Sequence, residues 1–364
     1  MLSKDQLFKL HSWVGIKLSI LLFVVCFSGT LAVLSHEMDW LFNPDVRVSP
    51  ADTYASWNTI AENVKQEFPE GKISYWQRAN EPYMADLIYV MQDNDLKYVF
   101  ANPHTGEVQG YADITIARFL RDLHYYLFIP FQIGHFTVLF FGFILTISLL
   151  TGIFYYNDWY KELFVLKSGK GSRVFYSSLH KLVGAWSIPF MFIISLTAIW
   201  YFVERADLPK VSSYLDEERP TIEITEGQQL PNLDYDAYVA IAEEAIAGLK
   251  VKSILSPQKP DEPVYLTGTS DVPLVRYRAN RVYINPHNQE LLKVQKATEI
   301  NSITWINDIA DPIHFGYWGG LLTKLIWFVF GLALSSLVLT GPWLYLKKRR
   351  KKDRLQRERR LAHG

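Results

Sequence analysis

The chain has 364 residues, of which 49% are hydrophobic and 15% aromatic, and its 37 basic and 37 acidic residues give a formal net charge of zero. A zero net charge excludes a global electrostatic attraction to nucleic acid or to acidic substrates. The single cysteine, Cys26, lies inside an apolar run, which excludes an intramolecular disulfide and a cysteine-based zinc or iron–sulfur site.

Four apolar runs are long enough to cross a bilayer, which requires roughly 20 residues at about 1.5 Å rise each. In chain order, these predicted spans are 13–34, 131–156, 182–203 and 321–346. Lys17 and Lys324 lie in the first turns of their runs, where the long side chains can reach the lipid headgroups. The first run is too long for a secretory signal and no small-x-small cleavage site follows it, so we expect it to remain in the mature protein.

Lysine and arginine gather on the short flanks of the spans, and such residues mark the cytoplasmic side. The link after the second span holds Lys161, Lys167, Lys170 and Arg173, and the C-terminal tail begins Lys-Lys-Arg-Arg-Lys-Lys. The two long segments between spans carry more acidic than basic residues and are placed outside. The sequence therefore predicts a multi-pass protein of the bacterial inner membrane with both termini in the cytoplasm and a disordered basic tail.

The predicted organisation divides the chain into eight segments. They are the N-terminus with the first span (1–36), a first outside domain (37–118), an interfacial segment with the second span (119–156), a cytoplasmic link (157–179), the third span (180–203), a second outside domain (204–312), the fourth span (313–346) and the basic tail (347–364).

The second half of the chain repeats the first. The stretch His11-Ser-Trp-Val-Gly15 matches His180-Lys-Leu-Val-Gly184. The last predicted span of each half ends in Leu-Thr-Gly, at 150–152 and 339–341. Because each half starts and ends inside, the halves form a parallel repeat about an axis along the membrane normal.

Each outside segment combines one helix of apolar spacing with short strands. The predicted helices are 54–68 and 235–249, and the predicted strands are 73–77, 84–91, 98–101, 264–268, 275–278 and 282–284. Both segments contain an Asn-Pro-His turn after a strand. The predicted fold is thus a membrane protein of four transmembrane helices in two parallel repeats, with two small α+β extracytoplasmic domains.

Three motifs occur together in this chain: a helix opening with His-x-x-x-Gly, an outside module with Asn-Pro-x-x-Gly-Glu, and a helix preceded by Leu-His and ended by Thr-Gly. Over nearly the whole chain this combination resembles the PepSY-associated transmembrane family. The resemblance implies PepSY-like outside domains, haem held between helices, and iron uptake by reduction, as in the ferrisiderophore reductases and iron-regulated membrane proteins of that family. The second half departs from the pattern by having Asn288-Gln289 where the first has Thr105-Gly106.

The nine histidines are the candidates for chemistry, because ionisable residues at membrane depth are costly and usually functional. His11 and His180 stand at the cytoplasmic starts of the first and third spans and form the better candidate pair of axial haem ligands. Gly15 and Gly184 follow four residues later on the same helical face, where a missing side chain lets a flat porphyrin approach. The alternative is a pair of interfacial histidines beside small packing residues.

His124 and His314 precede the second and fourth spans and are the candidate ligands of a second, outer haem. The alternative for this pair is a solvated interfacial position. His135 and His36 have no counterpart in the other half and are reserve ligands, although His36 could also join the two nearby carboxylates in a metal site. The histidines of the two Asn-Pro-His turns are predicted to be structural.

These assignments predict an electron conduit that carries two haem b groups and acts as a ferric-siderophore reductase, an oxidoreductase, on the periplasmic side. No residue is assigned a catalytic role. Neither a Gly-x-Gly-x-x-Gly after a strand nor a Gly-x-x-x-x-Gly-Lys-Ser/Thr motif occurs, so the electron donor must be separate, either a quinol or a cytoplasmic flavoprotein. The other expected partners are the lipid bilayer and the ferric siderophore or its periplasmic carrier, with no nucleic acid.

Two other functions remain open on the sequence. The outside domains could be binding or inhibitory modules for an envelope peptidase or another partner, with the helices as an anchor, and the protein would then be colourless. An iron-chelate permease would need broken helices and polar residues at the bilayer midplane. The polar residues available there are Ser28, Thr30, Ser195, Thr197, Ser335 and Ser336.

Overall fold

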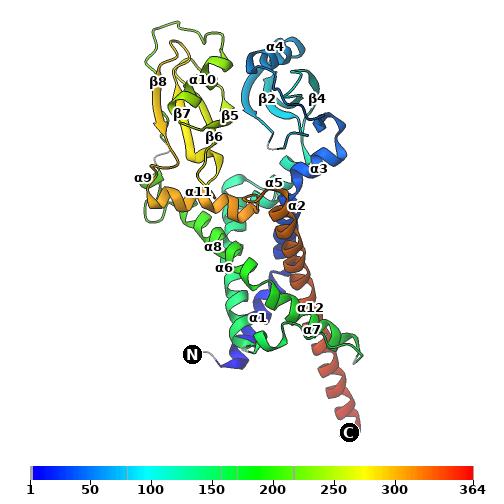
Figure 1. Cartoon of the computed structure of the whole chain (residues 1–364). Helices are drawn as coiled ribbons and strands as arrows, with labels where there is room; N and C mark the ends of the chain where they lie inside the picture. Colours follow the sequence, from blue (N-terminus) through cyan, green and yellow to red (C-terminus); the bar gives the residue numbers. More distant parts are fainter. Residues whose placement is uncertain (1–2, 80, 157, 170, 216–217, 364) are drawn as a thin grey trace. The chain divides into compact units, whose positions relative to one another are not determined.

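The computed structural model describes residues 3–79, 81–156, 158–169, 171–215 and 218–363 (Figure 1). Lys170 of the predicted link lies outside the described residues. Contacts divide the chain into two compact units. The helical unit comprises Met1–Leu34, Leu120–Pro209 and Ile313–Gly364, and the sheet unit comprises Ser35–Phe119 and Lys210–Pro312.

The helices of the helical unit cover the residues of the four predicted spans. They are α1 (Lys4–Lys17), α2 (Ser19–Val33), α6 (Phe131–Tyr155), η2 (Trp159–Glu162), α7 (Ser172–Trp186), α8 (Ile188–Arg205) and α12 (Gly320–His363), with α5 (Ile116–Tyr126) ending in this unit. In the described part of the chain, α6, α8 and α12 are each long and apolar enough to cross a membrane, and α1 with α2 makes a fourth span if the bent pair is one.

The first and third predicted spans are broken, which the sequence analysis did not anticipate. α1 and α2 are separated by Leu18 and bent by 71°, and α7 and α8 are separated by Ser187. These positions correspond when His11 is aligned with His180. Pro189 suits the start of α8, because a helix does not need the N–H of its first residues. At the break between α1 and α2, the Ser19 hydroxyl donates to the Ile16 carbonyl at 3.0 Å.

Each break moves the chain from one long helix to the other. α1 packs mainly on α6 of its own half, whereas α2 packs on α12 of the other half. In the second half, α7 packs on α12 and α8 packs on α6. Gly142 permits the close approach of α6 to α8, since a Cβ there would lie 2.7 Å from the Ala198 Cβ. The two halves are therefore interleaved within the helical unit.

The sheet unit is built on one eight-stranded antiparallel sheet of order β4-β3-β2-β1-β5-β6-β7-β8. Its strands are β1 (Lys72–Gln77), β2 (Asp86–Gln92), β3 (Asp95–Ala101), β4 (Val108–Ala112), β5 (Lys250–Leu255), β6 (Val264–Thr269), β7 (Asn280–Ile284) and β8 (Leu291–Gln295). The first and second outside segments meet where Trp76 of β1 pairs with Ile254 of β5. The two segments thus share one sheet rather than forming two separate sheets.

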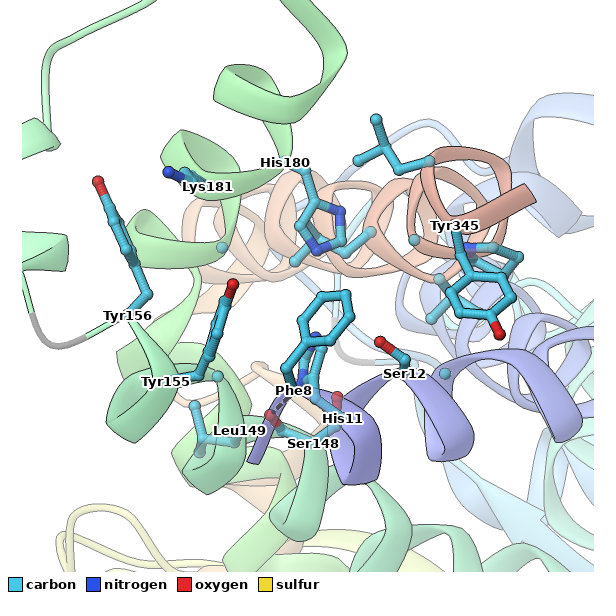
Figure 2. A pocket seen from close by; sticks show the side chains of 18 of the residues that line it. Phe8, His11, Ser12, Ser148, Leu149, Tyr155, Tyr156, His180, Lys181 and Tyr345 are labelled. Carbon is cyan, nitrogen blue, oxygen red and sulfur yellow. Dashed lines mark hydrogen bonds between the residues drawn. The ribbon is translucent and has the colours of Figure 1, made fainter. Parts of the chain in front are cut away.

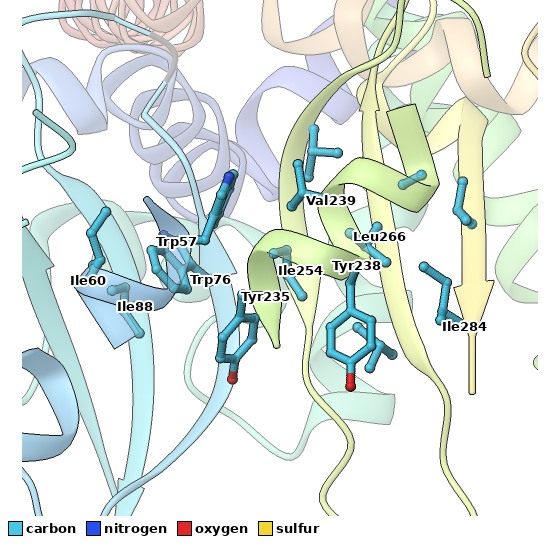
Figure 3. Packing of buried hydrophobic residues seen from close by; sticks show 14 of the residues in the cluster. Trp57, Ile60, Trp76, Ile88, Tyr235, Tyr238, Val239, Ile254, Leu266 and Ile284 are labelled. Atoms are coloured by element: carbon cyan, nitrogen blue, oxygen red, sulfur yellow. The ribbon is translucent and has the colours of Figure 1, made fainter. Parts of the chain in front are cut away.

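The remaining elements of the sheet unit are short helices. They are α3 (Ser35–Phe42), η1 (Pro44–Val46), α4 (Trp57–Glu67), α9 (Ser212–Leu215), α10 (Tyr235–Ala245), η3 (Tyr277–Ala279) and most of α11 (Ser302–Phe315). The main core of the unit lies between α4, α10 and one face of the sheet (Figure 3). Trp76, Ile254 and Leu266 are fully buried in it. Because both outside segments contribute to one sheet, their buried residues form one continuous hydrophobic core.

The two packed helices cap each other at their N-termini. The Asp236 carboxylate of α10 accepts from the backbone N–H of Trp57 at 2.8 Å and of Asn58 at 3.3 Å. In return, the Asn58 side-chain oxygen of α4 accepts from the N–H of Tyr235 at 2.8 Å and of Asp236 at 3.4 Å. Asn58 and Asp236 hold corresponding positions in the two helices, and each satisfies N–H groups that a helix start leaves unpaired.

The predicted strand 275–278 is wrong, because its backbone bonds to a helix instead. Arg276 donates its N–H to the Asp308 carbonyl of α11 at 2.9 Å, and its guanidinium pairs with Asp308 at 2.6 Å and Asp311 at 3.0 Å. Pro312 lacks the N–H that would otherwise bond to that carbonyl within the helix. The proline thus leaves an acceptor on α11, and the Arg276 N–H uses it.

The predicted disorder of the basic tail is also wrong, since α12 continues to His363. No glycine or proline interrupts the sequence after Pro342 until the last residue. Arg354 and Glu358 form an i,i+4 ion pair of 2.9 Å, which supports a helix by a few tenths of a kcal/mol. The tail is an extension of the last span.

Replacing Asp236 by alanine removes the acceptor for two N–H groups at the start of α4. We expect the free energy of unfolding of the sheet unit to fall by about 1–2 kcal/mol, because loss of a helix N-cap costs about 0.5–2 kcal/mol. Thermal denaturation of the purified protein in detergent, followed by circular dichroism, measures the change. Glu243→Ala, at an exposed position of the same helix, is the matched control. Equal stability of the two variants would contradict the reciprocal capping.

Candidate functional site

The helical unit encloses a cavity of about 470 Å³ lined by α1, α6, α7 and α12 (Figure 2). Pockets that hold small molecules and cofactors usually measure about 300–1,000 Å³. The lining includes His11 and His180, together with Gly15 and Gly184. The structure therefore brings together all four residues that the sequence analysis assigned to the inner site.

The two histidines enter the cavity from different helices. Figure 2 shows His180 extending from α7 toward the side on which Phe8 and His11 extend from α1. The two rings thus both line the same cavity. α1 ends at the bend before α2, and α7 ends at the break before α8, so each histidine belongs to the short helix that precedes a break.

Hydrogen bonds define which ring nitrogen of His11 carries the proton. Its Nδ1 lies 3.1 Å from the Ser148 carbonyl oxygen and 3.2 Å from Thr151 Oγ1. A carbonyl oxygen can only accept, so Nδ1 of a neutral ring must donate. The lone pair is then on Nε2, which is the nitrogen that a metal ion can bind.

Two further glycines adjoin the histidines. A Cβ at Gly152 would lie 3.6 Å from His11 Cε1, and a Cβ at Gly341 would lie 3.7 Å from His180 Cε1. By contrast, a Cβ at Gly15 would meet no atom within 4 Å. The sequence analysis used the Leu-Thr-Gly stretches only to align the repeat and missed their place at this site. Their occurrence at the end of the last predicted span of each half was the available signal.

Basic residues at the helix ends also line the cavity, and the sequence analysis did not assign them. Arg173 comes from the start of α7, Lys181 from its third turn, and Lys348 from the basic extension of α12. The Lys181 Nζ lies 4.3 Å from the ring centroid of Tyr156, and the Lys348 Nζ lies 4.4 Å from that of Phe8. The cavity thus combines an apolar interior with cations that can pair with carboxylates.

The second predicted pair, His124 of α5 and His314 of α11, is also brought together. The ring centroids are 6.4 Å apart and the ring planes differ by 39°. A metal ion bound at this site would be held by these two imidazoles, one from each helix.

The Nδ1 atoms of the outer histidines also face hydrogen-bonding partners. His124 Nδ1 lies 2.9 Å from the Val25 carbonyl oxygen, and His314 Nδ1 lies 2.7 Å from Thr197 Oγ1, whose hydroxyl donates to the Ile193 carbonyl. Gly29 is needed beside His124, because a Cβ there would lie 2.6 Å from His124 Cε1. A larger residue at position 29 would displace the ring.

The reserve ligands are not part of either pair. His135 is buried, stacks on Phe131 with centroids 5.3 Å apart, and has its Nδ1 3.1 Å from the Tyr125 carbonyl oxygen. His36 is exposed on α3, and Asp39 beside it accepts from two N–H groups at the start of α5. Among the described residues, no group of three or more histidine, cysteine or acidic side chains is arranged to hold a metal ion.

The histidines of the two outside turns bond to backbone carbonyls. His104 Nδ1 lies 2.7 Å from the Thr53 oxygen, and His287 Nε2 lies 2.8 Å from the Pro260 oxygen. These bonds connect each turn to a neighbouring loop, in keeping with the structural role predicted for both residues.

Comparison with protein families agrees with this architecture. The profile described as the PepSY-associated TM region matches residues 8–348, nearly the whole chain. The chain belongs to this family. Among curated proteins, none matches the chain at a significant level. Family membership and the long apolar helices together make the chain a multi-pass membrane protein that carries a PepSY-like α+β domain, and the predicted family is confirmed.

Proposed function

We propose that this protein is a haem-containing electron conduit of the bacterial inner membrane that reduces a ferric siderophore on the periplasmic side. The observation that carries the proposal is the position of His11 and His180, which come from matching positions of the two halves and extend into one cavity. In this proposal the chain crosses the membrane four times as two parallel repeats, and both termini are cytoplasmic.

The residues of the inner site fit haem b, and the outer pair offers two further imidazoles. Each imidazole ligand requires an unprotonated nitrogen, and the contacts of the four histidines leave the lone pair on Nε2. Gly15 and Gly184 would let the flat macrocycle approach the helices, and the nearby cations would pair with its two carboxylates. His11 with His180 would hold the inner group, and His124 with His314 the outer one.

When bound, haem supplies one-electron chemistry that amino-acid side chains lack. The chain's own residues orient the ligand imidazoles and keep the inner site apolar, which limits access of water. Phe190, Met191 and Leu337 are among the buried residues that pack between the long helices. The electron donor is separate from this chain, a quinol or a cytoplasmic flavoprotein.

The proposed reaction acts on iron held by hard oxygen ligands. Transfer of one electron converts Fe(III) to Fe(II), which carries less charge and binds such ligands less strongly. A siderophore would then release the iron outside the membrane. The sheet unit, formed by both outside segments, would bind the ferric siderophore or the carrier that delivers it.

The helix breaks at Leu18 and Ser187 also bear on the permease alternative, because transporters use discontinuous helices at their binding sites. Several midplane hydroxyls, however, donate to carbonyls of their own helices, with Ser28 bonded to Val25 and Thr30 bonded to Cys26. These side chains cap local backbone groups rather than line a path. The breaks are better explained by the histidine sites beside them.

The proposal predicts a coloured protein whose spectrum depends on both histidine pairs. Purified protein should show the sharp, split α-band of low-spin iron with two imidazole ligands after reduction with dithionite. His180→Ala should remove the inner haem and His124→Ala the outer one, each lowering the haem content by about half, because each site loses a ligand. His104→Ala, in an outside turn, is the control and should keep the full spectrum. A colourless wild-type protein would favour the anchored binding module.

Filling the inner cavity provides a second test. Gly184→Leu places a branched side chain in the cavity beside His180, so we expect loss of the inner haem while the outer haem is retained. Ser336→Leu adds a comparable side chain at an exposed position of α12 and should change neither. Haem content per protein and the reduced-minus-oxidised spectrum report the result. Full occupancy of both sites in Gly184→Leu would argue against a ligand in this cavity.

A further inference from the structure

We propose that Thr151 and Thr340, from the two Leu-Thr-Gly stretches, are positioning residues that hold His11 and His180 in one tautomer with Nε2 available to the cavity. This inference rests on the proposed function and adds a role for a motif that the ligand assignments leave unexplained. Each threonine belongs to the long helix of the same half as its histidine.

The contacts are equivalent in the two halves. Thr151 Oγ1 of α6 lies 3.2 Å from His11 Nδ1, and Thr340 Oγ1 of α12 lies 2.8 Å from His180 Nδ1. The glycine that follows each threonine lies beside the ring, since an added Cβ would be in ordinary van der Waals contact with it at the distances of 3.6 and 3.7 Å given above. The threonine therefore supplies the hydrogen bond, and the glycine after it packs beside the ring.

The hydroxyl protons determine the direction of these hydrogen bonds. Thr151 Oγ1 donates to the Ile147 carbonyl at 2.6 Å, and Thr340 Oγ1 donates to the Ser336 carbonyl at 2.8 Å. A hydroxyl has one proton, so with that proton engaged it can only accept from the histidine. Nδ1 must then carry the proton in both rings, and the opposite tautomer would bring two lone pairs together.

The outer site contains a third example of the same arrangement. Thr197 of α8 donates to the Ile193 carbonyl at 2.8 Å and faces His314 Nδ1 at 2.7 Å. A threonine that back-bonds to its own helix thus presents an acceptor to a histidine on another helix in each case. Three occurrences at candidate ligand histidines favour a function in the sites over a role in helix packing.

The two inner histidines differ in how much they depend on their threonines. His11 Nδ1 has a second acceptor, the Ser148 carbonyl at 3.1 Å. For His180 Nδ1, Thr340 is the one acceptor found within the described residues. A hydrogen bond made by the ring nitrogen that does not bind the metal fixes the orientation of a ligand imidazole and increases its basicity. Loss of such a bond typically lowers metal affinity about 10–100-fold. Loss of Thr340 should therefore have the larger effect.

Valine replaces threonine with nearly the same shape but without the hydroxyl. We expect Thr340→Val to weaken haem retention at the inner site about 10-fold and to raise the midpoint potential of that haem, because the less basic imidazole stabilises the ferric state less. Thr151→Val should shift both quantities in the same direction by less. Thr340→Ser, which restores the hydroxyl, should return both toward the wild-type values.

Thr146→Val is the matched control. Thr146 also lies on α6 and donates to the carbonyl four residues before it, Gly142, at 2.8 Å, but within the described residues its hydroxyl contacts no histidine. Haem transfer to an excess of apomyoglobin measures retention, and a redox titration of the full-length protein measures the potential. Equal values for Thr340→Val and Thr146→Val would overturn the proposal.

A measurement without haem separates this inference from the proposed function. In haem-free protein containing labelled histidine, the ring carbon and nitrogen shifts in solid-state NMR report the tautomer. We expect Thr340→Val to remove one histidine from the Nδ1-protonated population, and Thr146→Val to leave that population unchanged. An unchanged tautomer in Thr340→Val would refute the positioning role, whether or not the protein binds haem. A changed tautomer in a protein that binds no haem would refute only the proposed function.

Discussion

A bilayer offers no water to backbone N–H and C=O groups, so a membrane helix can be interrupted only where the protein itself provides partners. The helical unit depends on two such interruptions. Ser187 is fully buried and donates its N–H to the Val183 carbonyl at 2.9 Å, and Ser19 donates its hydroxyl to the Ile16 carbonyl. These local bonds satisfy backbone groups beside the breaks, and the segments before the breaks, α1 and α7, bring His11 and His180 to the cavity.

The sheet unit uses a comparable exchange of groups between the two halves of the chain. β1 and β5 pair edge to edge, and Asn58 and Asp236 cap one another's helices. An exposed strand edge would otherwise be open to pairing with another molecule. The continuous sheet protects both inner edges and gives the two small α+β segments a common core, which neither has the size to form well alone.

Much of the architecture could be predicted from the sequence because it depends on long or repeated patterns. The spans follow from apolar length, and the His-x-x-x-Gly repeat placed His11 and His180 at the same depth. The outer pair was harder, because His124 and His314 differ by one residue in the alignment of the halves. The one-residue difference lies in the turns that follow the two histidines, where Leu127 and Gly316 have positive φ.

Other features depend on tertiary contacts and have weak local signals. The bend of 71° at Leu18 has only a weak local signal, since the nearest glycine is Gly15, three residues earlier, and no proline lies in α1 or α2. The edge strand β4 was missed because its residues are only partly buried and include a glycine. The role of Thr340 could not be predicted from its own helix, where a threonine that bonds to the preceding turn is ordinary. The histidine that gives it a function comes from 160 positions away.

The crossed packing of the helices also makes each half depend on the other. α2 lies on the long helix of the other half, as does α8, so either half alone would leave its outer segment without the surface it packs on. This is the arrangement of a domain-swapped dimer joined into one polypeptide.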